Sequence, residues 1–76
     1  MRLNVVIVDD EIEITRGLSH YISETSNDFN VIAMFTRGRD ALEFVRSNQV
    51  NILITDINMP DMNGLDIIKA LHAENK

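Results

Sequence analysis

Short apolar runs of strand length alternate with segments of helical periodicity along the whole chain. The runs cover residues 3–8, 29–35 and 50–55, and the last is apolar almost throughout. Strands of this kind, each followed by a helix, indicate a parallel sheet covered on both faces. The sequence therefore predicts an α/β fold in the order βαβαβα. After each run, apolar residues recur at the spacing of one helix face: Ile14, Leu18, Tyr21 and Ile22, then Ala41, Leu42 and Val45, then Leu65, Ile68 and Leu71.

The predicted strands can be arranged in few ways. Right-handed crossovers restrict the topology of parallel strands. A flavodoxin-like winding then gives the first three strands the spatial order 2-1-3, which makes the first and third strands neighbours. Asp10 and Glu13 resemble a capping box, which starts the first helix near Glu11. A turn at Gly38 precedes the second helix, and Asn63 is the expected N-cap of the third.

The composition narrows the class of protein further. With 76 residues the chain forms at most one small domain, and it has no cysteine for disulfides or thiolate metal sites. Its net charge is −5 and its seven basic residues are scattered, whereas nucleic-acid-binding surfaces cluster Lys and Arg. The run 3–8 is too short for a signal-peptide core or a membrane span. We therefore expect a cytoplasmic protein in which this segment contacts neither nucleic acid nor membrane directly.

Acidic residues follow the first and third predicted strands at the point where each strand ends. Asp9 and Asp10 come after the first strand, and Asp56 comes after the third. Adjacent parallel strands lie about 4.8 Å apart, and this edge is the switch point where open α/β sheets bind ligands. Crowded carboxylates repel one another unless a cation lies between them, and hard oxygen ligands suit Mg²⁺. The sequence predicts a magnesium site here; a plain helix N-cap for Asp10 and a turn at Asp56 remain open.

The segment from Asp56 to Gly64 contains the turn-forming residues of the chain's last connection. Pro60 fixes its own φ, and Gly64 permits backbone angles that other residues avoid. A loop of this kind can direct the backbone carbonyl of Asn58 toward a metal bound by Asp56. A plain strand-to-helix turn explains the same residues equally well, so both interpretations stay open.

Several motifs together make the chain similar to the receiver domains of bacterial two-component response regulators. They are Val5-Val6-Ile7-Val8-Asp9-Asp10-Glu11, Ile52-Leu53-Ile54-Thr55-Asp56, Met59-Pro60 and Met62-Asn63-Gly64-Leu65, with Gly38 and Ala41-Leu42 in addition. The resemblance implies that Asp56 accepts a phosphoryl group from a phosphohistidine on a sensor histidine kinase. It also implies that Asp10 binds Mg²⁺ directly and that Asp9 helps to hold the ion or its water. Asn58 would contribute its backbone carbonyl.

The resemblance further implies that residues 1–76 are a partial receiver domain. A complete receiver has five strands and five helices, so we expect the first three βα units of a flavodoxin-like sheet here. The last two units and an output domain, such as a transcription regulator, would lie outside this chain. A Ser or Thr after the fourth strand and a Lys after the fifth would then be missing. We expect a signalling domain and not an enzyme, with slow or undetectable phosphorylation of this chain alone.

Two other functions remain open. One is a non-catalytic interaction module that pairs with another copy or with the missing half. The apolar third strand has an open edge in this scheme, which predicts a homodimer or swapped oligomer joined there. The other is an aspartate-nucleophile phosphatase, which usually needs a second Asp two residues after the nucleophile as general acid. Asn58 occupies that position, which disfavours the phosphatase.

Overall fold

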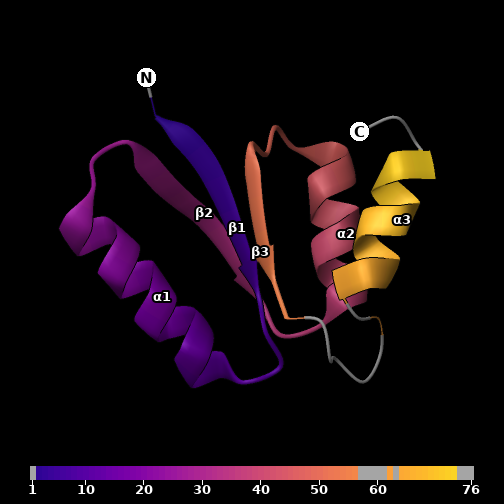
Figure 1. Ribbon diagram of the computed structural model, residues 1–76, viewed down its shortest axis with the longest axis horizontal. Helices are drawn as coiled ribbons and strands as arrows, with labels where there is room; N and C mark the ends of the chain where they lie inside the picture. The colour runs from indigo at the N-terminus through magenta and orange to yellow at the C-terminus, as the bar shows by residue number, and fades with distance from the viewer. Residues whose placement is uncertain (1, 57–61, 63, 74–76) are drawn as a thin grey trace.

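Six elements alternate along the chain in the computed structural model, which describes residues 2–56, 62 and 64–73 (Figure 1). The predicted α/β class and the order βαβαβα are confirmed. In chain order the elements are β1 (Leu3–Val8), α1 (Ile12–Thr25), β2 (Phe29–Phe35), α2 (Gly38–Ser47), β3 (Ile52–Thr55) and α3 (Gly64–Ala73).

The three strands form one parallel sheet in the order β2-β1-β3, as predicted. β1 is the central strand, and its Ile7 lies opposite Met34 on one side and Ile54 on the other. The register with β2 shifts between Val5 and Val6, where β2 contributes one extra residue. The register with β3 is regular. The carboxyl ends of β1 and β3 therefore lie side by side at one edge of the sheet.

β3 begins two residues later than the apolar run 50–55 suggests. The Asn4 N–H donates a hydrogen bond to Asn51 Oδ1 at 2.7 Å, and the Asn4 side-chain amide donates to Gln49 O at 2.9 Å. Asparagine side chains compete with strand pairing through such bonds to the backbone. The regular ladder therefore starts only at Ile52.

The core lies on both faces of β1, whose last four residues are buried. Side chains alternate across a strand, so Val6 and Val8 point to one face, where they pack with Ile67 of α3. Val5 points to the opposite face, where it lines a hollow with Ile22 of α1. Figure 1 shows α1 on one side of the sheet and α2 with α3 on the other. Both faces are covered, as predicted.

The buried side of α1 differs from the predicted apolar face. Thr15 is buried, whereas Ile14 and Tyr21 are 42% and 66% exposed. Leu18 and Ile22, also part of the predicted face, are half-buried. The physical reason is that α1 packs against β2 and β1, so only the residues turned toward those two strands are covered.

The helices are short. α1 has 14 residues, and α2 and α3 have 10 each. A membrane-spanning helix needs about 20 consecutive apolar residues. None of the helices within the described ranges combines the length and the apolar character that a membrane span requires.

Candidate functional site

Backbone hydrogen bonds extend both strand ladders to the aspartates that follow the strands. The Asp9 N–H donates to Phe35 O at 3.0 Å, and the Asp56 N–H donates to Val8 O at 3.0 Å. Each aspartate therefore lies one residue after the end of its own strand and is hydrogen-bonded to the backbone of the neighbouring strand. The positions of these two residues follow from strand pairing at the carboxyl edge of the sheet.

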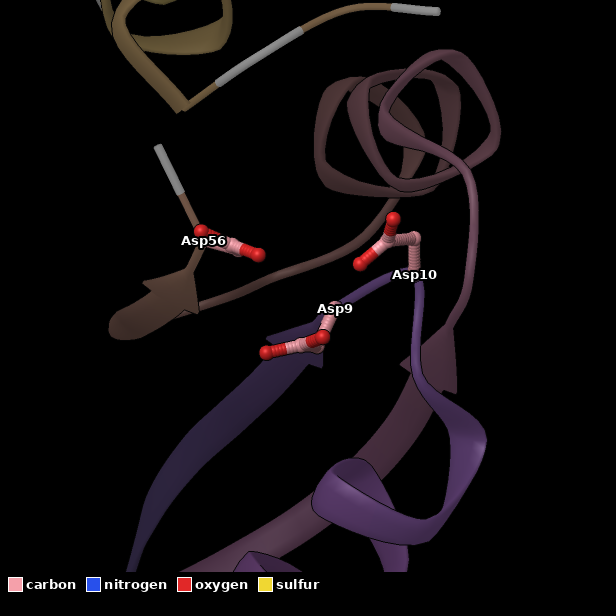
Figure 2. A group of neighbouring side chains, drawn as sticks. All are labelled: Asp9, Asp10 and Asp56. Carbon is pink, nitrogen blue, oxygen red and sulfur yellow. The ribbon is translucent and has the colours of Figure 1, made fainter. Parts of the chain in front are cut away.

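The side chains of Asp9, Asp10 and Asp56 form one cluster at this edge. One carboxylate oxygen from each lies within 4.8 Å of the other two. Figure 2 shows Asp10 and Asp56 turned toward each other across the strand ends, with Asp9 at the end of β1 beside them. Asp10 is exposed, and Asp9 and Asp56 are half-buried, so solvent reaches the cluster. The structure thus brings together all three aspartates that the sequence predicts to converge.

A tight turn after β1 fixes the side chain of Asp9. The Glu11 N–H donates to Asp9 Oδ1 at 2.9 Å, which is the side-chain to backbone bond of an Asx turn. Helix α1 then begins with Glu11 as its N-cap, without a side-chain capping hydrogen bond. The predicted capping box of Asp10 and Glu13 is therefore wrong. Because the Asx turn makes the connection, the Asp10 carboxylate joins the cluster and does not cap the helix.

The three carboxylates suit a hard divalent cation. Negative groups this close repel one another, and a cation between them offsets the repulsion. Mg²⁺ binds oxygen ligands at 2.0–2.1 Å and usually keeps several waters beside one or two carboxylates. Ligands on opposite sides of the ion are thus about 4.2 Å apart, close to the 4.8 Å limit of this cluster. The fourth predicted ligand, the backbone carbonyl of Asn58, lies outside the described residues.

The backbone carbonyl of Asp56 accepts two hydrogen bonds. The Gly64 N–H, at the start of α3, donates at 3.0 Å, and the Thr55 hydroxyl donates at 3.1 Å. A Cβ on Gly64 would lie 2.8 Å from this carbonyl oxygen and 2.9 Å from Thr55 Cγ2. The sequence pattern indicated a special backbone angle at Gly64. The structure shows instead that a glycine is required because there is no room for a side chain at this position. Sequence patterns carry no signal for such a close approach.

Residues 5–76 match the model of the family described as response regulator receiver domain. The matched range includes both strand ends that carry the acidic cluster. The chain therefore belongs to the response regulator receiver family, which serves signalling in two-component systems.

Curated relatives and a solved structure agree with this assignment. The chain is 41% identical over 64 residues to transcriptional regulatory protein HptR of Staphylococcus aureus, covering 84% of this chain and 25% of that protein. It is 36% identical over 70 residues to a protein-glutamate methylesterase/protein-glutamine glutaminase of Paramagnetospirillum magneticum, covering 92% and 19%. The receiver domain of AraT, a response regulator from Geobacillus stearothermophilus, superposes with a TM-score of 0.85 at 33% identity. That match covers 96% of this chain and 57% of the AraT chain.

Proposed function

We propose that this protein is a phosphoacceptor module of a two-component phosphorelay, with Asp56 as the acceptor and Mg²⁺ bound beside it. The donor is a phosphohistidine on a sensor histidine kinase. The observation that carries the proposal is the convergence of Asp9, Asp10 and Asp56 within 4.8 Å in a chain of the receiver family. Other acidic side chains of the chain do not share this convergence among the described residues.

Asp56 acts as the nucleophile in the proposed reaction. A carboxylate oxygen of Asp56 attacks phosphorus, and the new P–O bond forms as the P–N bond to the donor imidazole breaks. The electron pair stays on the imidazole nitrogen, which takes a proton from water. The product on this chain is an acyl phosphate. Its backbone support is in place, since the N–H of Asp56 is bonded to Val8 and its carbonyl to Gly64.

Asp9 and Asp10 hold the cation in the proposed reaction. The Asx turn with Glu11 fixes the orientation of Asp9, and Asp10 reaches the same space from the exposed side. The bound cation supplies positive charge that offsets the negative charge of the transferring phosphoryl group. Asn58 is proposed as a further ligand through its backbone carbonyl.

The partners of the module follow from the same proposal. The chain spans 25% of HptR and 19% of the methylesterase, so an output domain beyond this segment is proposed and its type stays open. The net charge of −5 disfavours direct contact with nucleic acid by this segment. We propose that the module meets its kinase in the cytoplasm.

Phosphorylation of the chain tests the proposal directly. Incubation with acetyl phosphate and Mg²⁺, followed by intact mass measurement, should show slow addition of one phosphoryl group that requires the metal. We expect a slow reaction from residues 1–76 alone, because the resemblance implies that the Ser or Thr and the Lys of a receiver's phosphoryl site follow a fourth and a fifth strand, and preorganised charge carries much of such catalysis. Asp56→Asn should abolish the addition, and Asp28→Asn, an exposed control, should not. Equal addition to Asp56→Asn and the parent would overturn the assignment.

A second candidate function is self-association through β3. Three hollows border this strand on both faces of the sheet: Ile52 and Leu53 line the first, Leu53 and Thr55 the second, and Ile52 and Ile54 the third. Within the described residues β3 pairs only with β1. The occupant that fits is a strand apolar on both faces, and β3 of a second copy is such a strand. We therefore propose a dimer in which one sheet continues from copy to copy.

A further inference from the structure

Two glycines, Gly38 at the start of α2 and Gly64 at the start of α3, are closely approached by backbone atoms of distant residues. The first is Gly38, the opening residue of α2, which is buried. A Cβ at this position would collide with the backbone oxygen of Met62, and would lie 3.0 Å from Met62 Cβ and 3.1 Å from its carbonyl carbon. Backbone atoms cannot swing away as the end of a flexible side chain can. Any side chain at position 38 must therefore displace the chain at Met62.

The second close contact is at Gly64, two residues after Met62. The Gly64 N–H donates to the Asp56 carbonyl at 3.0 Å, with no room for a Cβ between Gly64 and that oxygen. Two residues span only about 7 Å of chain, so a displacement at Met62 is passed to Gly64. The close contacts thus join α2 to Met62 and the start of α3 to the backbone of Asp56.

The packing of the helices makes this path stiff. Ala41 and Leu42 of α2 are buried in the same cluster as Ile67 of α3, and Met62 packs against that cluster. Close-packed interiors transmit small shifts and do not absorb them. A displacement that begins at Gly38 therefore has little room to dissipate before it reaches the start of α3.

We propose that Gly38 is a positioning residue for the acceptor aspartate. By admitting the backbone of Met62 against the start of α2, it sets the first residue of α3 on the Asp56 carbonyl. That contact in turn sets the direction of the Asp56 carboxylate relative to Asp9 and Asp10. The effect on cation binding rests on the proposed function of the cluster, whereas the effect on the Gly64 hydrogen bond does not.

Gly38→Ala tests the proposal, with Gly17→Ala as the matched control. Gly17 lies in α1 and a Cβ there meets no atom within 4 Å. Amide hydrogen exchange and Mg²⁺ titration, both followed by NMR, give the two readouts. In metal-free Gly38→Ala, exchange at the Gly64 amide should accelerate relative to the Asp9 amide, which is bonded to Phe35. The affinity for Mg²⁺ should fall roughly ten-fold, as for residues that orient metal ligands.

The outcomes separate positioning from a general loss of stability. A merely structural role would speed exchange at Gly64 and Asp9 alike, and this result would overturn the proposal, as would an unchanged Gly64 amide. If the parent shows no Mg²⁺ shifts at Asp9, Asp10 and Asp56, the proposed function fails, and exchange at Gly64 still decides the role of Gly38. Should Gly38→Ala not fold, Mg²⁺ should shift the Gly38 amide signal of the parent but not that of Gly17. No shift at Gly38 on saturation would then refute the proposal.

Discussion

The three carboxylates of the acidic cluster differ in how they are supported. Asp9 and Asp56 are tied to neighbouring strands through their backbone N–H groups, and the Asp9 side chain also accepts the Glu11 N–H. Asp10 is exposed, and no hydrogen bond reaches its side chain from the described part of the chain. Removing the charge of Asp10 should therefore change cation binding while leaving the fold intact.

Cation binding should raise the melting temperature of the protein. A ligand of the native state alone stabilises it by about 2.7 kcal/mol at one hundred times its Kd. In a domain of this size each 1 kcal/mol corresponds to roughly 4–8 °C. We expect this rise with Mg²⁺ or Mn²⁺, followed by circular dichroism, and a smaller rise for Asp10→Asn and Asp56→Asn.

The control for this experiment is Asp28→Asn, an exposed aspartate outside the cluster. It removes the same formal charge from the chain and should keep the full response to the metal. A general effect of net charge would instead weaken all three variants equally. If Asp10→Asn and Asp56→Asn bind the metal as well as the parent does, the metal site is wrongly assigned.

The sequence predicted the convergence of the aspartates but indicated the glycines of the site only as turn residues, and the difference has a physical cause. Asp9 and Asp56 end apolar runs, and the pairing of parallel strands then dictates that they meet. Gly38 and Gly64 are needed because distant backbone approaches them, at Met62 and Asp56. Such an approach depends on how α2 and α3 pack, which local sequence does not determine. Asn58 lies outside the described residues, and its role stays a prediction.

Within the described residues β3 pairs with β1 alone, so its other backbone edge is unpaired. The Asp56 N–H bonds to Val8 of β1, and N–H groups alternate in direction along a strand. The N–H groups of Leu53 and Thr55 therefore point away from β1, toward the open edge. Edges of this kind recruit further strands.

The dimer proposed above makes a residue-specific prediction for this edge. Amides of Leu53 and Thr55 should exchange fast in dilute protein and slowly in concentrated protein, because pairing with a second copy protects them. Amides of Ile52 and Ile54 should be protected at both concentrations by β1. Hydrogen exchange by NMR, combined with sedimentation at the same concentrations, measures both effects.

Ile54→Lys should shift the equilibrium toward monomer, since a lysine on an edge strand opposes strand addition. Met34→Lys is the matched control, because Met34 is 45% exposed on β2, the opposite edge strand of the sheet. It should leave association unchanged. The dimer would be ruled out if the parent protein sediments as a monomer at every concentration and the amides of Leu53 and Thr55 exchange at the same rate in dilute and concentrated protein.

Prediction from sequence was accurate for β1 and β2, placed the start of β3 two residues too early, and was less accurate for the helix faces. The bounds of β1 and β2 match the apolar runs 3–8 and 29–35, because runs rich in β-branched and aromatic residues favour strands. The predicted face of α1 was wrong at Ile14 and Tyr21, and that of α3 was wrong at Leu65 and Ile68, which are exposed. Apolar spacing gives the side of a helix that can be buried, and the strands beneath it determine which part is buried.

At the scale of the whole molecule, stability depends on a small core. Ile67 is fully buried in the cluster of α2 and α3, whereas its neighbour Ile68 is 55% exposed. Ile67→Ala should lower the free energy of unfolding by about 2–5 kcal/mol, through lost burial and a remaining cavity. That is a large part of the 5–15 kcal/mol typical of a domain. Urea unfolding measures the loss.

Ile68→Ala removes the same atoms from the neighbouring position and should change stability by only about 0.5 kcal/mol. The two variants thus compare the same substitution at a buried and at an exposed position. Equal losses for the two variants would mean that the packing of α3 differs from the structure. A concentration-dependent loss at Ile68 would instead indicate that association covers this residue.

The overall topology could be predicted because few arrangements satisfy the rules for parallel strands. The apolar runs indicated a sheet buried on both faces, and right-handed crossovers with flavodoxin-like winding gave the order 2-1-3, which the structure confirms. The register shift between Val5 and Val6 could not be predicted. Such a shift places one extra residue in one strand of a pair, and the alternation of apolar residues gives no signal for it.

The bond between the Asp56 N–H and Val8 O also has a kinetic consequence. The two residues are 56 − 8 = 48 positions apart, so the cation site cannot assemble until a long loop has closed. Closing such loops costs entropy before any contact compensates for it, which places this pairing late in folding. A cation that needs both strand ends then stabilises the native state more than the transition state. It should slow unfolding and leave the refolding rate nearly unchanged. The metal would therefore increase the kinetic stability of the folded sheet without speeding its formation.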